Sequence, residues 1–347
     1  MSTDITPELC RTVAEDSLDH LFGLLKPNGR FVYSHKAGDV TLEGPGYNLL
    51  RHCGTVWFMC LAIEGLGRRL SAEQAAALAA GVGHVADKMR TPPWLHGNWP
   101  CLALVSRGRI KLGGVGLAML MMHEYQQVAR QNGLSTAFLD RTPDLIVSQL
   151  ENYALLQISS GDFIHKRDFD TGRISPFYSE YYTGEALYGL MRGGRSSAVL
   201  RSVMEGLMQK NYGYAVQSHW MAYAACEAAE RRLVDADIAR SYVIGLIENI
   251  VRDPSYRKRR NSTPIACRTE ALCCFLALAR RFRPPGWPFP EDLIREAKSS
   301  AEENLRLQLQ WYKDGQFWRG DDEDRVQIDY VQHNATAFLN WYLLHRA

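Results

Sequence analysis

The sequence lacks the features that mark membrane, secreted and nucleic-acid-binding proteins. No stretch approaches the roughly 18 consecutive apolar residues of a membrane span. Residues 1–25 carry acidic side chains where a signal peptide would be basic. An excess of one charge is also missing, because 40 basic residues face 38 acidic ones and the net charge is +2. We therefore expect a cytoplasmic protein that contacts neither nucleic acid nor a membrane.

The eight cysteines show no metal-binding or disulfide pattern. None belongs to a C-x-x-C pair, and no group of cysteines and histidines has the spacing of a zinc site. Most of them lie in apolar helical segments, as Cys60 and Cys273 do. We interpret them as small buried apolar side chains in a reducing compartment, with zinc binding as the minor alternative. No metal and no cofactor is therefore expected.

Strand-like alternation is scarce, and helical periodicity dominates the chain. The pattern predicts about twelve helices, over residues 7–25, 46–66, 71–90, 113–131, 139–157, 179–192, 196–209, 217–233, 236–252, 264–282, 290–311 and 329–345. Short β-like segments at 29–33, 161–165 and 315–318 each follow a helix and begin at a glycine. This weak internal repeat is typical of a closed array, with small hairpins at one rim and no central sheet.

Two kinds of helix alternate along the chain. Some, such as 71–90 and 290–311, carry a charged face, whereas others are apolar nearly all round, as at 113–122 and 221–226. A helix that is apolar on every side is buried, so the second kind forms an inner layer. Alternating outer and inner helices with short connections predict an all-α (α/α)6 toroid. No linker or low-complexity segment divides the chain, so we expect a single domain over residues 1–347.

In such a ring the N-terminal ends of the inner helices meet on one face, and each carries about half a positive charge. Polar and aromatic side chains are concentrated at these ends and become rare deeper in the helices. Taken singly, a residue such as His52 or His219 is also explained as a hydrogen-bonded core histidine. Taken together, the residues predict a small-molecule pocket that favours an anionic or polyhydroxylated ligand.

Two sets of site residues follow from this placement. The catalytic candidates are Tyr181, Glu185, Glu270, Asp329, Tyr330 and His333. The substrate-binding candidates are Tyr47, Arg51, His52, Lys111, Tyr182, His219, Trp220, Arg268, Trp318 and Arg319. A buried carboxylate is costly without a partner, so Glu270 is expected to pair outside its own helix, with Arg51 as the candidate.

Three further patterns have simpler interpretations. Residues 320–325 form an acidic run that we interpret as a solvated loop, with a divalent-cation site as the alternative. The basic run at 257–260 is interpreted as a solvated loop, with phosphate contact as the alternative. Gly113, Gly114 and Gly116 do not follow a strand in this interpretation, so a dinucleotide fold is not supported.

Three segments resemble those of six-hairpin, toroid-type carbohydrate-active proteins. They are Tyr47-Asn48-Leu49-Leu50-Arg51-His52, Tyr181-Tyr182-Thr183-Gly184-Glu185-Ala186-Leu187 and Asp329-Tyr330-Val331-Gln332-His333-Asn334. The similarity is closest to uncharacterised bacterial members and to the helical domain of uronyl epimerases. The Tyr-Glu-Glu-Tyr-like segment of the epimerases corresponds to Tyr178-Ser179-Glu180-Tyr181-Tyr182. The resemblance implies tyrosines and histidines of inner helices around a sugar site, whereas the extra β-domains of the epimerases have no counterpart.

The leading hypothesis is a carbohydrate-active enzyme that applies general acid–base catalysis to an anionic or polyhydroxylated sugar, either a small molecule or an oligosaccharide. For epimerisation, isomerisation or elimination, the proton carriers would be Tyr181, Tyr330 or His333, and the cations that stabilise an enolate would be Arg51, Lys111 or Arg268. For hydrolysis, the carboxylate pair would come from Glu185, Glu270 and Asp329.

Two other functions stay open at this stage, as does the oligomeric state. A terpene-cyclase-like or peptide-tailoring cyclase would have an aromatic pocket and an essential acid at 321–324 or at Asp329. A non-catalytic toroid would bind a partner through its concave face, with its inner polar groups mutually satisfied and no cavity.

Overall fold

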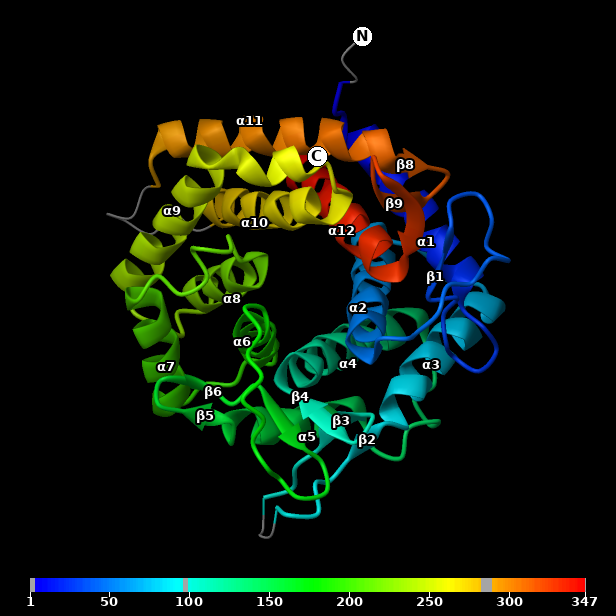
Figure 1. Cartoon of the computed structure of the whole chain (residues 1–347), viewed down its shortest axis with the longest axis vertical. Helices are drawn as coiled ribbons and strands as arrows, with labels where there is room; N and C mark the ends of the chain where they lie inside the picture. Colours follow the sequence, from blue (N-terminus) through cyan, green and yellow to red (C-terminus); the bar gives the residue numbers. More distant parts are fainter. Residues whose placement is uncertain (1–3, 96–98, 282–288, 347) are drawn as a thin grey trace.

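The computed structural model describes residues 4–95, 99–281 and 289–346, and within them twelve α-helices form a closed ring (Figure 1). The outer helices are α1 (Pro7–Leu24), α3 (Ala72–Ala86), α5 (Pro143–Leu155), α7 (Ala198–Gln209), α9 (Ala236–Arg252) and α11 (Glu291–Gln308). The inner helices are α2 (Leu49–Gly65), α4 (Leu112–Asn132), α6 (Tyr182–Arg192), α8 (His219–Glu230), α10 (Ser262–Arg281) and α12 (Ile328–His345). Every predicted helix is present, with ends that differ by a few residues.

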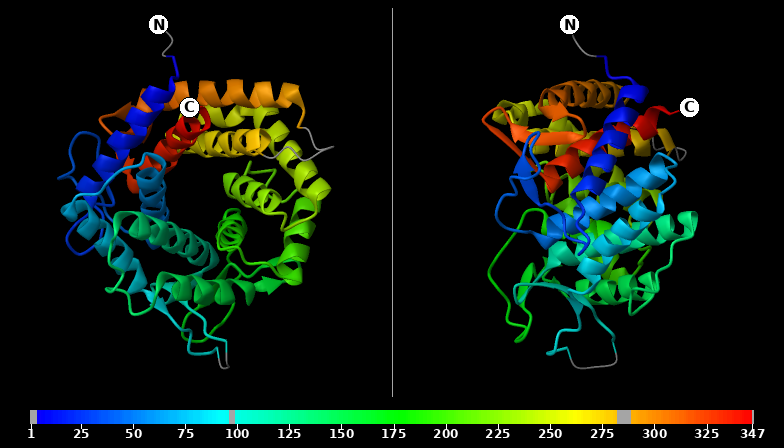
Figure 2. Two further views of the ribbon diagram at one scale, coloured as in Figure 1. Left: turned by 180° about the vertical axis from the view of Figure 1, so that it is seen from behind. Right: turned by 90° about the vertical axis from the view of Figure 1, so that its right-hand side faces the viewer.

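The inner helices close the ring by packing in sequence order. Each contacts the next, from α2 through α4, α6, α8 and α10 to α12, and α12 returns to α2. The outer helices surround them, as the view from behind also shows (Figure 2). The all-α (α/α)6 toroid expected from the alternation of helix types is therefore confirmed.

Local sequence signals explain where the helices begin and end. At the start of α3, the Ser71 side chain accepts from the backbone of Gln74, and the Gln74 side chain accepts from the backbone of Ser71, which makes a capping box. Ser218 caps α8 by accepting from the backbone of Met221. Helix α4 ends at Gly133, whose φ of 65° lies in the left-handed region that favours glycine.

In the described part of the chain, ten short strands lie beside the helices. They are β1 (Ser34–Lys36), β2 (Met89–Arg90), β3 (Ala103–Ser106), β4 (Arg109–Lys111), β5 (Ile158–Ser159), β6 (Asp162–Phe163), β7 (Lys166–Asp168), β8 (Tyr312–Lys313), β9 (Gln316–Gly320) and β10 (Glu323–Gln327). The β5–β6 and β8–β9 hairpins match two of the expected β-like segments, whereas at 29–33 only Phe31 pairs, through an isolated bridge to Leu25. The side view shows the strands gathered toward one side of the ring (Figure 2).

Two four-stranded sheets were not anticipated. One has the order β1-β10-β9-β8 and the other β2-β3-β4-β7, and all their pairings are antiparallel. Each sheet joins strands that are far apart in the sequence, for example Ser34 beside Gln327. Local composition does not reveal such pairings because each strand spans five residues or fewer.

The acidic run at 320–325 is solvent-exposed at Asp321, Asp322 and Asp324, as expected, but it is not a loop throughout, because its second half belongs to β10. Asp321 accepts from Arg260 and from the indole nitrogen of Trp311, while Glu323 pairs with Arg319 and Arg325. With Asp321 and Glu323 already paired, the run gives little support to a cation site.

Residues 257–259 of the basic run belong to a 3-10 helix, η1 (Pro254–Arg259), and were wrongly expected to form a loop, while Arg260 follows the helix as its C-cap. The guanidinium of Arg257 donates to Asn304 and Glu303 on α11, and that of Arg260 pairs with Asp321. Both arginines therefore fasten this segment to its surroundings.

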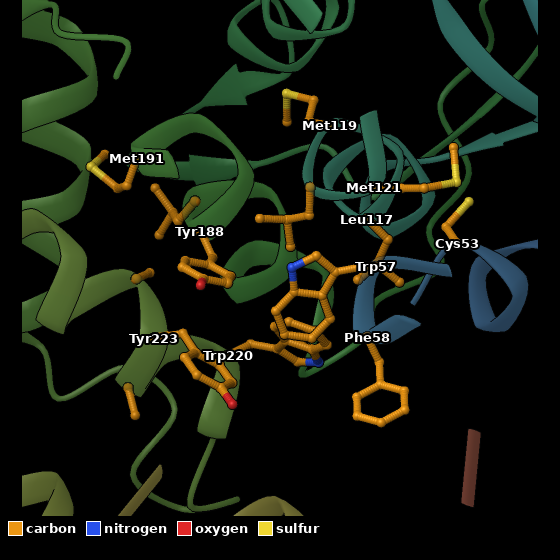
Figure 3. Packing of buried hydrophobic residues seen from close by; sticks show 14 of the residues in the cluster. Cys53, Trp57, Phe58, Leu117, Met119, Met121, Tyr188, Met191, Trp220 and Tyr223 are labelled. Carbon is orange, nitrogen blue, oxygen red and sulfur yellow. The ribbon is translucent and has the colours of Figure 1, made fainter. Parts of the chain in front are cut away.

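Aromatic side chains fill the centre of the ring. The rings of Trp57 and Trp220 lie 5.6 Å apart between centroids, and those of Tyr188 and Tyr223 stack at 5.0 Å (Figure 3). Trp220 faces a cavity at the N-terminal ends of the inner helices, whereas the other three residues face a cavity at the C-terminal ends. The aromatic cluster thus separates a front cavity from a rear one.

Among the described residues, α10 alone has the length and composition of a membrane-spanning helix. It is an inner helix of the ring, and 67% of its most apolar window is buried. Packing against α8, α11 and α12 accounts for that apolar surface.

Candidate active site

The front cavity has a volume of about 400 Å³ and lies where the inner helices begin. Its walls come from all six inner helices and the segments before them. The lining residues are Asn48, Leu50, Arg51, Leu117, Ser179, Glu180, Tyr181, Tyr182, Glu185, Ala215, Val216, His219, Trp220, Arg259, Thr263, Pro264, Cys267, Arg268 and His333. A concave site that combines apolar side chains with several converging polar groups is the usual form of a small-molecule site.

Four residues on one side of the cavity form a compact polar cluster. His219 lies at the start of α8, Cys267 and Glu270 on α10, and His333 on α12, and one ligand-type atom from each lies within 4.8 Å of the others. All four side chains are buried. The rings of His219 and His333 are 5.1 Å apart and nearly perpendicular.

His333 is held from behind by a carboxylate. Its Nδ1 lies 2.8 Å from Oε1 of Glu270, and Oε2 of Glu270 accepts from the hydroxyl of Tyr223 at 2.9 Å. That hydroxyl also accepts from the side-chain amide of Asn340 at 2.9 Å. The chain of contacts fixes the orientation of the His333 ring, as a carboxylate behind a functional histidine commonly does.

The pKa values of the two histidines are shifted in opposite directions. Burial, together with the charges of His333 and Arg268, lowers the pKa of His219 well below its ordinary value. Burial also opposes the charged form of His333, but Cys267 and Glu270 outweigh it and raise its pKa well above the ordinary value. A pair of titratable groups with separated pKa values can supply a base and an acid at the same pH.

His219 has an unused hydrogen-bonding atom. Its Nε2 is buried and has no partner among the described residues, although the side chain lines the cavity. A buried polar atom without a partner costs free energy, so its position calls for an explanation such as a ligand. A substrate or an ion in the cavity would supply that partner.

Glu185 is a second buried group without a full set of partners. Its Oε2 has no hydrogen-bond partner in the described part of the chain. Burial raises the pKa of this carboxyl to about 7, against the effect of the positive charges on Arg51 and His333. Near neutral pH its protonated form is therefore well populated and can donate a hydrogen bond to a ligand.

Glycines on α4 explain how Glu185 reaches its position. A Cβ at Gly113 would collide with Oε2 of Glu185 and the ring of Tyr182, and one at Gly116 would collide with the backbone carbonyl of Glu185. The two inner helices therefore approach each other where α4 has no side chain. Contrary to the expectation from the sequence, a strand, β4, does precede these glycines. Because β4 pairs antiparallel with β3 and β7, the glycine pattern is still a feature of helix packing and not of a dinucleotide fold.

Three arginines, Arg51, Arg259 and Arg268, border the cavity, and the contacts of Arg51 and Arg268 differ. Nε of Arg51 lies 3.3 Å from Oδ2 of the buried Asp329, yet 40% of its side chain stays exposed. Arg268 is anchored by Gln217, whose Oε1 accepts at 3.1 Å, and by the carbonyl oxygen of Val216 at 2.7 Å. Arg51 is thus freer to contact a ligand, whereas Arg268 mainly holds the segment before α8.

Half of the sequence-predicted site residues line this cavity. They are Arg51, Tyr181, Tyr182, Glu185, His219, Trp220, Arg268 and His333. Glu270 and Asp329 lie one layer behind, in contact with His333 and Arg51 respectively. The expected Glu270–Arg51 pair is wrong, because Glu270 contacts His333 and Tyr223 while Arg51 pairs with Asp329.

Six other predicted residues are not among those that line the cavity. The Tyr47 hydroxyl lies 2.6 Å from Nδ1 of His52, and Nε2 of His52 lies 2.9 Å from the carbonyl oxygen of Gly81. This pair braces α2 against α3, so both ring nitrogens of His52 are engaged.

The remaining four belong to the strands and their vicinity. Lys111 ends β4, and Trp318 and Arg319 lie in β9, where Arg319 pairs with Glu323. The hydroxyl of Tyr330 accepts from Arg325 at 3.3 Å.

Sequence reasoning missed Cys267 as a site residue. We interpreted it, with the other cysteines, as a small apolar core residue, yet it lines the cavity beside His333. Its position three residues before Glu270 on one helix was a usable signal, because residues three apart share a helix face.

Comparison with known proteins adds information on the fold. The sequence matches no protein-family model and no curated protein. Among solved structures, a D-mannose isomerase superposes with a TM-score of 0.67 at 11% identity, covering 98% of this chain and 100% of that one. A GH76A α-1,6-mannanase from Salegentibacter sp. HEL1_6 gives a TM-score of 0.45 at 11% identity, over 97% and 100% of the two chains.

A possible member of the GH105 family from Salmonella enterica gives a TM-score of 0.44 at 11% identity, over 99% of this chain and 96% of that one. At such identities the likeness establishes the fold alone. The chain therefore shares the (α/α)6 toroid fold of the D-mannose isomerase, whose superposition has the highest TM-score of the three.

Proposed function

We propose that this protein is a sugar isomerase that moves a proton between C1 and C2 of a reducing monosaccharide, interconverting an aldose and a ketose. The observation that carries the proposal is the pair of buried histidines, His219 and His333, that face the same cavity with ring centroids 5.1 Å apart. Proton transfer next to a carbonyl needs one base and one acid close together, and histidine suits both roles.

The arrangement favours isomerisation over hydrolysis. Glycoside hydrolysis needs two carboxyl groups that face the scissile bond from opposite sides. Here Glu270 is engaged by His333 and Tyr223, and Asp329 is engaged by Arg51. Of the two glutamates that line the cavity, Glu180 is exposed at the rim and Glu185 is buried. The histidines are thus better placed for proton transfer than the carboxyl groups are.

His219 and His333 have complementary roles, and each histidine ends the reaction in the protonation state in which it began. His219, neutral because burial lowers its pKa, removes the proton from C2 of the open-chain aldose. His333, protonated and held by Glu270, donates a proton to O1 to give an enediol. His219 then returns its proton to C1 while His333 recovers one from O2, which yields the ketose. The reaction needs no oxidant, reductant or other co-reactant.

Other lining residues suit the binding of a sugar. Arg51 presents a partly exposed guanidinium that donates to the developing negative charge on the enediolate oxygens. The protonated Glu185 donates to a hydroxyl, and Tyr181 and Trp220 offer aromatic surfaces to the sugar ring. The fold of a D-mannose isomerase over the whole chain is consistent with this assignment, and a monosaccharide is the substrate we propose.

The two alternative functions receive less support. A non-catalytic ring would have its inner polar groups mutually satisfied, whereas a cavity is present and Nε2 of His219 has no partner among the described residues. The cyclase hypothesis placed an essential acid at 321–324 or at Asp329. Asp321 and Glu323 are paired with arginines outside the cavity, and Asp329 is paired with Arg51.

The test follows the exchange of sugar hydrogen atoms with solvent deuterium during turnover. The purified protein is incubated in D2O with D-mannose, D-glucose, N-acetylhexosamines and uronic acids, and the products are followed by NMR. We expect a ketose from at least one aldose, with deuterium at C1 or C2. His219→Ala and His333→Ala should each slow the reaction by at least about 100-fold. His345→Gln, at the other end of α12, is the matched control and should keep the rate.

Two results would overturn the proposal. One is the absence of deuterium uptake from every aldose tested, and the other is unchanged turnover in both histidine variants. Deuterium at C2 of a recovered aldose, with inversion and without ketose, would replace isomerisation by epimerisation within the same proton-transfer chemistry.

A further inference from the structure

We infer that His219, Cys267, Glu270 and His333 form a binding site for a divalent transition metal ion with the chemistry of Zn²⁺, and that the bound ion blocks the proton transfer proposed above. The binding of zinc does not depend on the proposed function. The inhibition does, because it requires the two histidines to be the proton carriers.

The positions of the donor atoms carry the inference. One donor from each residue lies within 4.8 Å of the other three. Tetrahedral zinc, with bonds of about 2.0–2.3 Å, places its ligand atoms about 3.3–3.6 Å apart. Side-chain rotations that shorten the longest separations by about 1 Å would therefore complete the shell.

The backbone supplies these donors from rigid elements. Cys267 and Glu270 are three residues apart on α10, so they share one helix face, while His219 and His333 come from the neighbouring helices α8 and α12. A site assembled from three packed helices is better fixed than one on loops.

The chemical types of the four donor side chains indicate which metal ion the site prefers. Two imidazoles, one thiol and one carboxyl group match the ligands that zinc takes in proteins. Mg²⁺ and Ca²⁺ prefer shells of oxygen atoms, and this cluster has a single carboxyl group. Zinc is thus favoured over the hard cations.

A second observation independently points to a ligand. Nε2 of His219 is buried without a partner in the described part of the chain, and only 3% of the residue is exposed. His219, Cys267 and His333 all line the front cavity, so an ion from solvent has a path to three of the four donors. His20 and His35 also have a buried Nε2 without a partner in the described part of the chain, but neither is among the residues that line this cavity, whereas His219 is.

Zinc binding at this site releases protons, and this release can be measured. Zinc displaces the proton of the Cys267 thiol and the proton between Glu270 and His333, because the metal ligands must be deprotonated. Binding therefore releases protons into a weakly buffered solution. A coordinated imidazole has no free lone pair, so His219 can no longer accept the proton from C2. The N–H left on a coordinated His333 is a much weaker acid than an imidazolium, so proton donation to O1 also stops.

The experiment titrates Zn²⁺ into the full-length protein after removal of metals, in competition with a chromophoric chelator. We expect one zinc per chain, and at least about tenfold weaker binding for Cys267→Ser and for His219→Gln. Co²⁺ in place of Zn²⁺ should give a thiolate charge-transfer band that Cys267→Ser abolishes. Cys274→Ser, in the rear cavity, is the matched thiol control and should bind as the wild type does.

Each outcome has a defined meaning. Equal binding by the wild type and Cys267→Ser, or loss of binding in Cys274→Ser, would overturn the site. Thermal melting of each variant shows whether a loss of zinc reflects a loss of fold. If zinc binds at one per chain but sugar turnover persists, the inhibition is overturned while the site stands. If no sugar is turned over at all, the proposed function fails and the zinc titration remains a valid test.

Discussion

Oε1 of Glu270 lies 2.8 Å from Nδ1 of His333, and this contact links the two helices α10 and α12 at the floor of the front cavity. Both side chains are buried from solvent. The carboxylate stabilises the protonated form of His333 and sets the direction in which the ring points. Glu270 is therefore a positioning residue, because it acts through His333.

Replacing Glu270 by glutamine tests that role. We expect kcat to fall by about 100-fold while KM changes less than about threefold, because the amide no longer stabilises the protonated imidazole. Steady-state kinetics with the sugar found by NMR provide the measurement. Tyr223→Phe removes only the outer hydrogen bond and should have a smaller effect on kcat. If the fall in kcat were accompanied by a matching fall in the free energy of unfolding, the role of Glu270 would be purely structural.

Arg51 should contribute to catalysis beyond its ion pair with Asp329. Arg51→Ala removes the partly exposed guanidinium from the cavity, and we expect kcat/KM to fall by about 100-fold because a donor to the enediolate oxygens is lost. Arg319→Ala is the control, since Arg319 pairs with Glu323 outside the cavity, and it should keep full activity. If the two variants behaved alike, Arg51 would have no contact with substrate.

The fold could be predicted from the sequence because its main signal is local. The contrast between charged helices such as α11 and apolar ones such as α4 follows directly from which faces are buried. The sheets could not be predicted in the same way. Strand β1 has three residues and pairs with β10 nearly 300 positions later, so its formation depends on the closed ring.

The candidate site was predictable in location more than in detail. The cavity lies at the inner-helix N-termini, where polar residues were concentrated, and it includes His219 and His333. Partners could not be assigned because they depend on distances between helices. Tyr47 and His52 share a turn with Arg51, yet they face α3 and not the cavity. Cys267 was overlooked because a cysteine in an apolar helix is more often a core residue.

The close approach of α4 and α6 should be sensitive to a single methyl group. Gly116→Ala would place a Cβ against the backbone carbonyl of Glu185, which cannot move as a flexible side chain can. We expect the free energy of unfolding to fall by about 1–3 kcal/mol. Gly206→Ala, on the outer helix α7 where a Cβ meets nothing within 4 Å, should be neutral or stabilising by up to about 1 kcal/mol. Urea denaturation measures both, and similar changes in the two variants would contradict the packing argument.

Glu151 on α5 should make the protein less stable as the pH rises. Its side chain is 6% exposed, and Arg195 lies 3.7 Å from one carboxyl oxygen. Burial raises the pKa of Glu151 to about 7, against an ordinary value of 4.5. Between those values the folded state binds more protons than the unfolded state, so this group stabilises the fold fully below pH 4.5. That contribution is lost as the pH rises through about 7.

The variant Glu151→Gln stays neutral and should remove this part of the pH dependence. We compare the free energies of unfolding of the two proteins by urea denaturation between pH 4.5 and 8. Across this range the free energy of unfolding of the wild type should fall by up to about 3 kcal/mol more than that of the variant, since one pKa unit corresponds to about 1.4 kcal/mol. Glu73→Gln, on the exposed surface of α3, is the control and should follow the wild-type curve. Parallel curves for the wild type and Glu151→Gln would show that Glu151 does not titrate in this range, which would mean that Arg195 compensates for its burial.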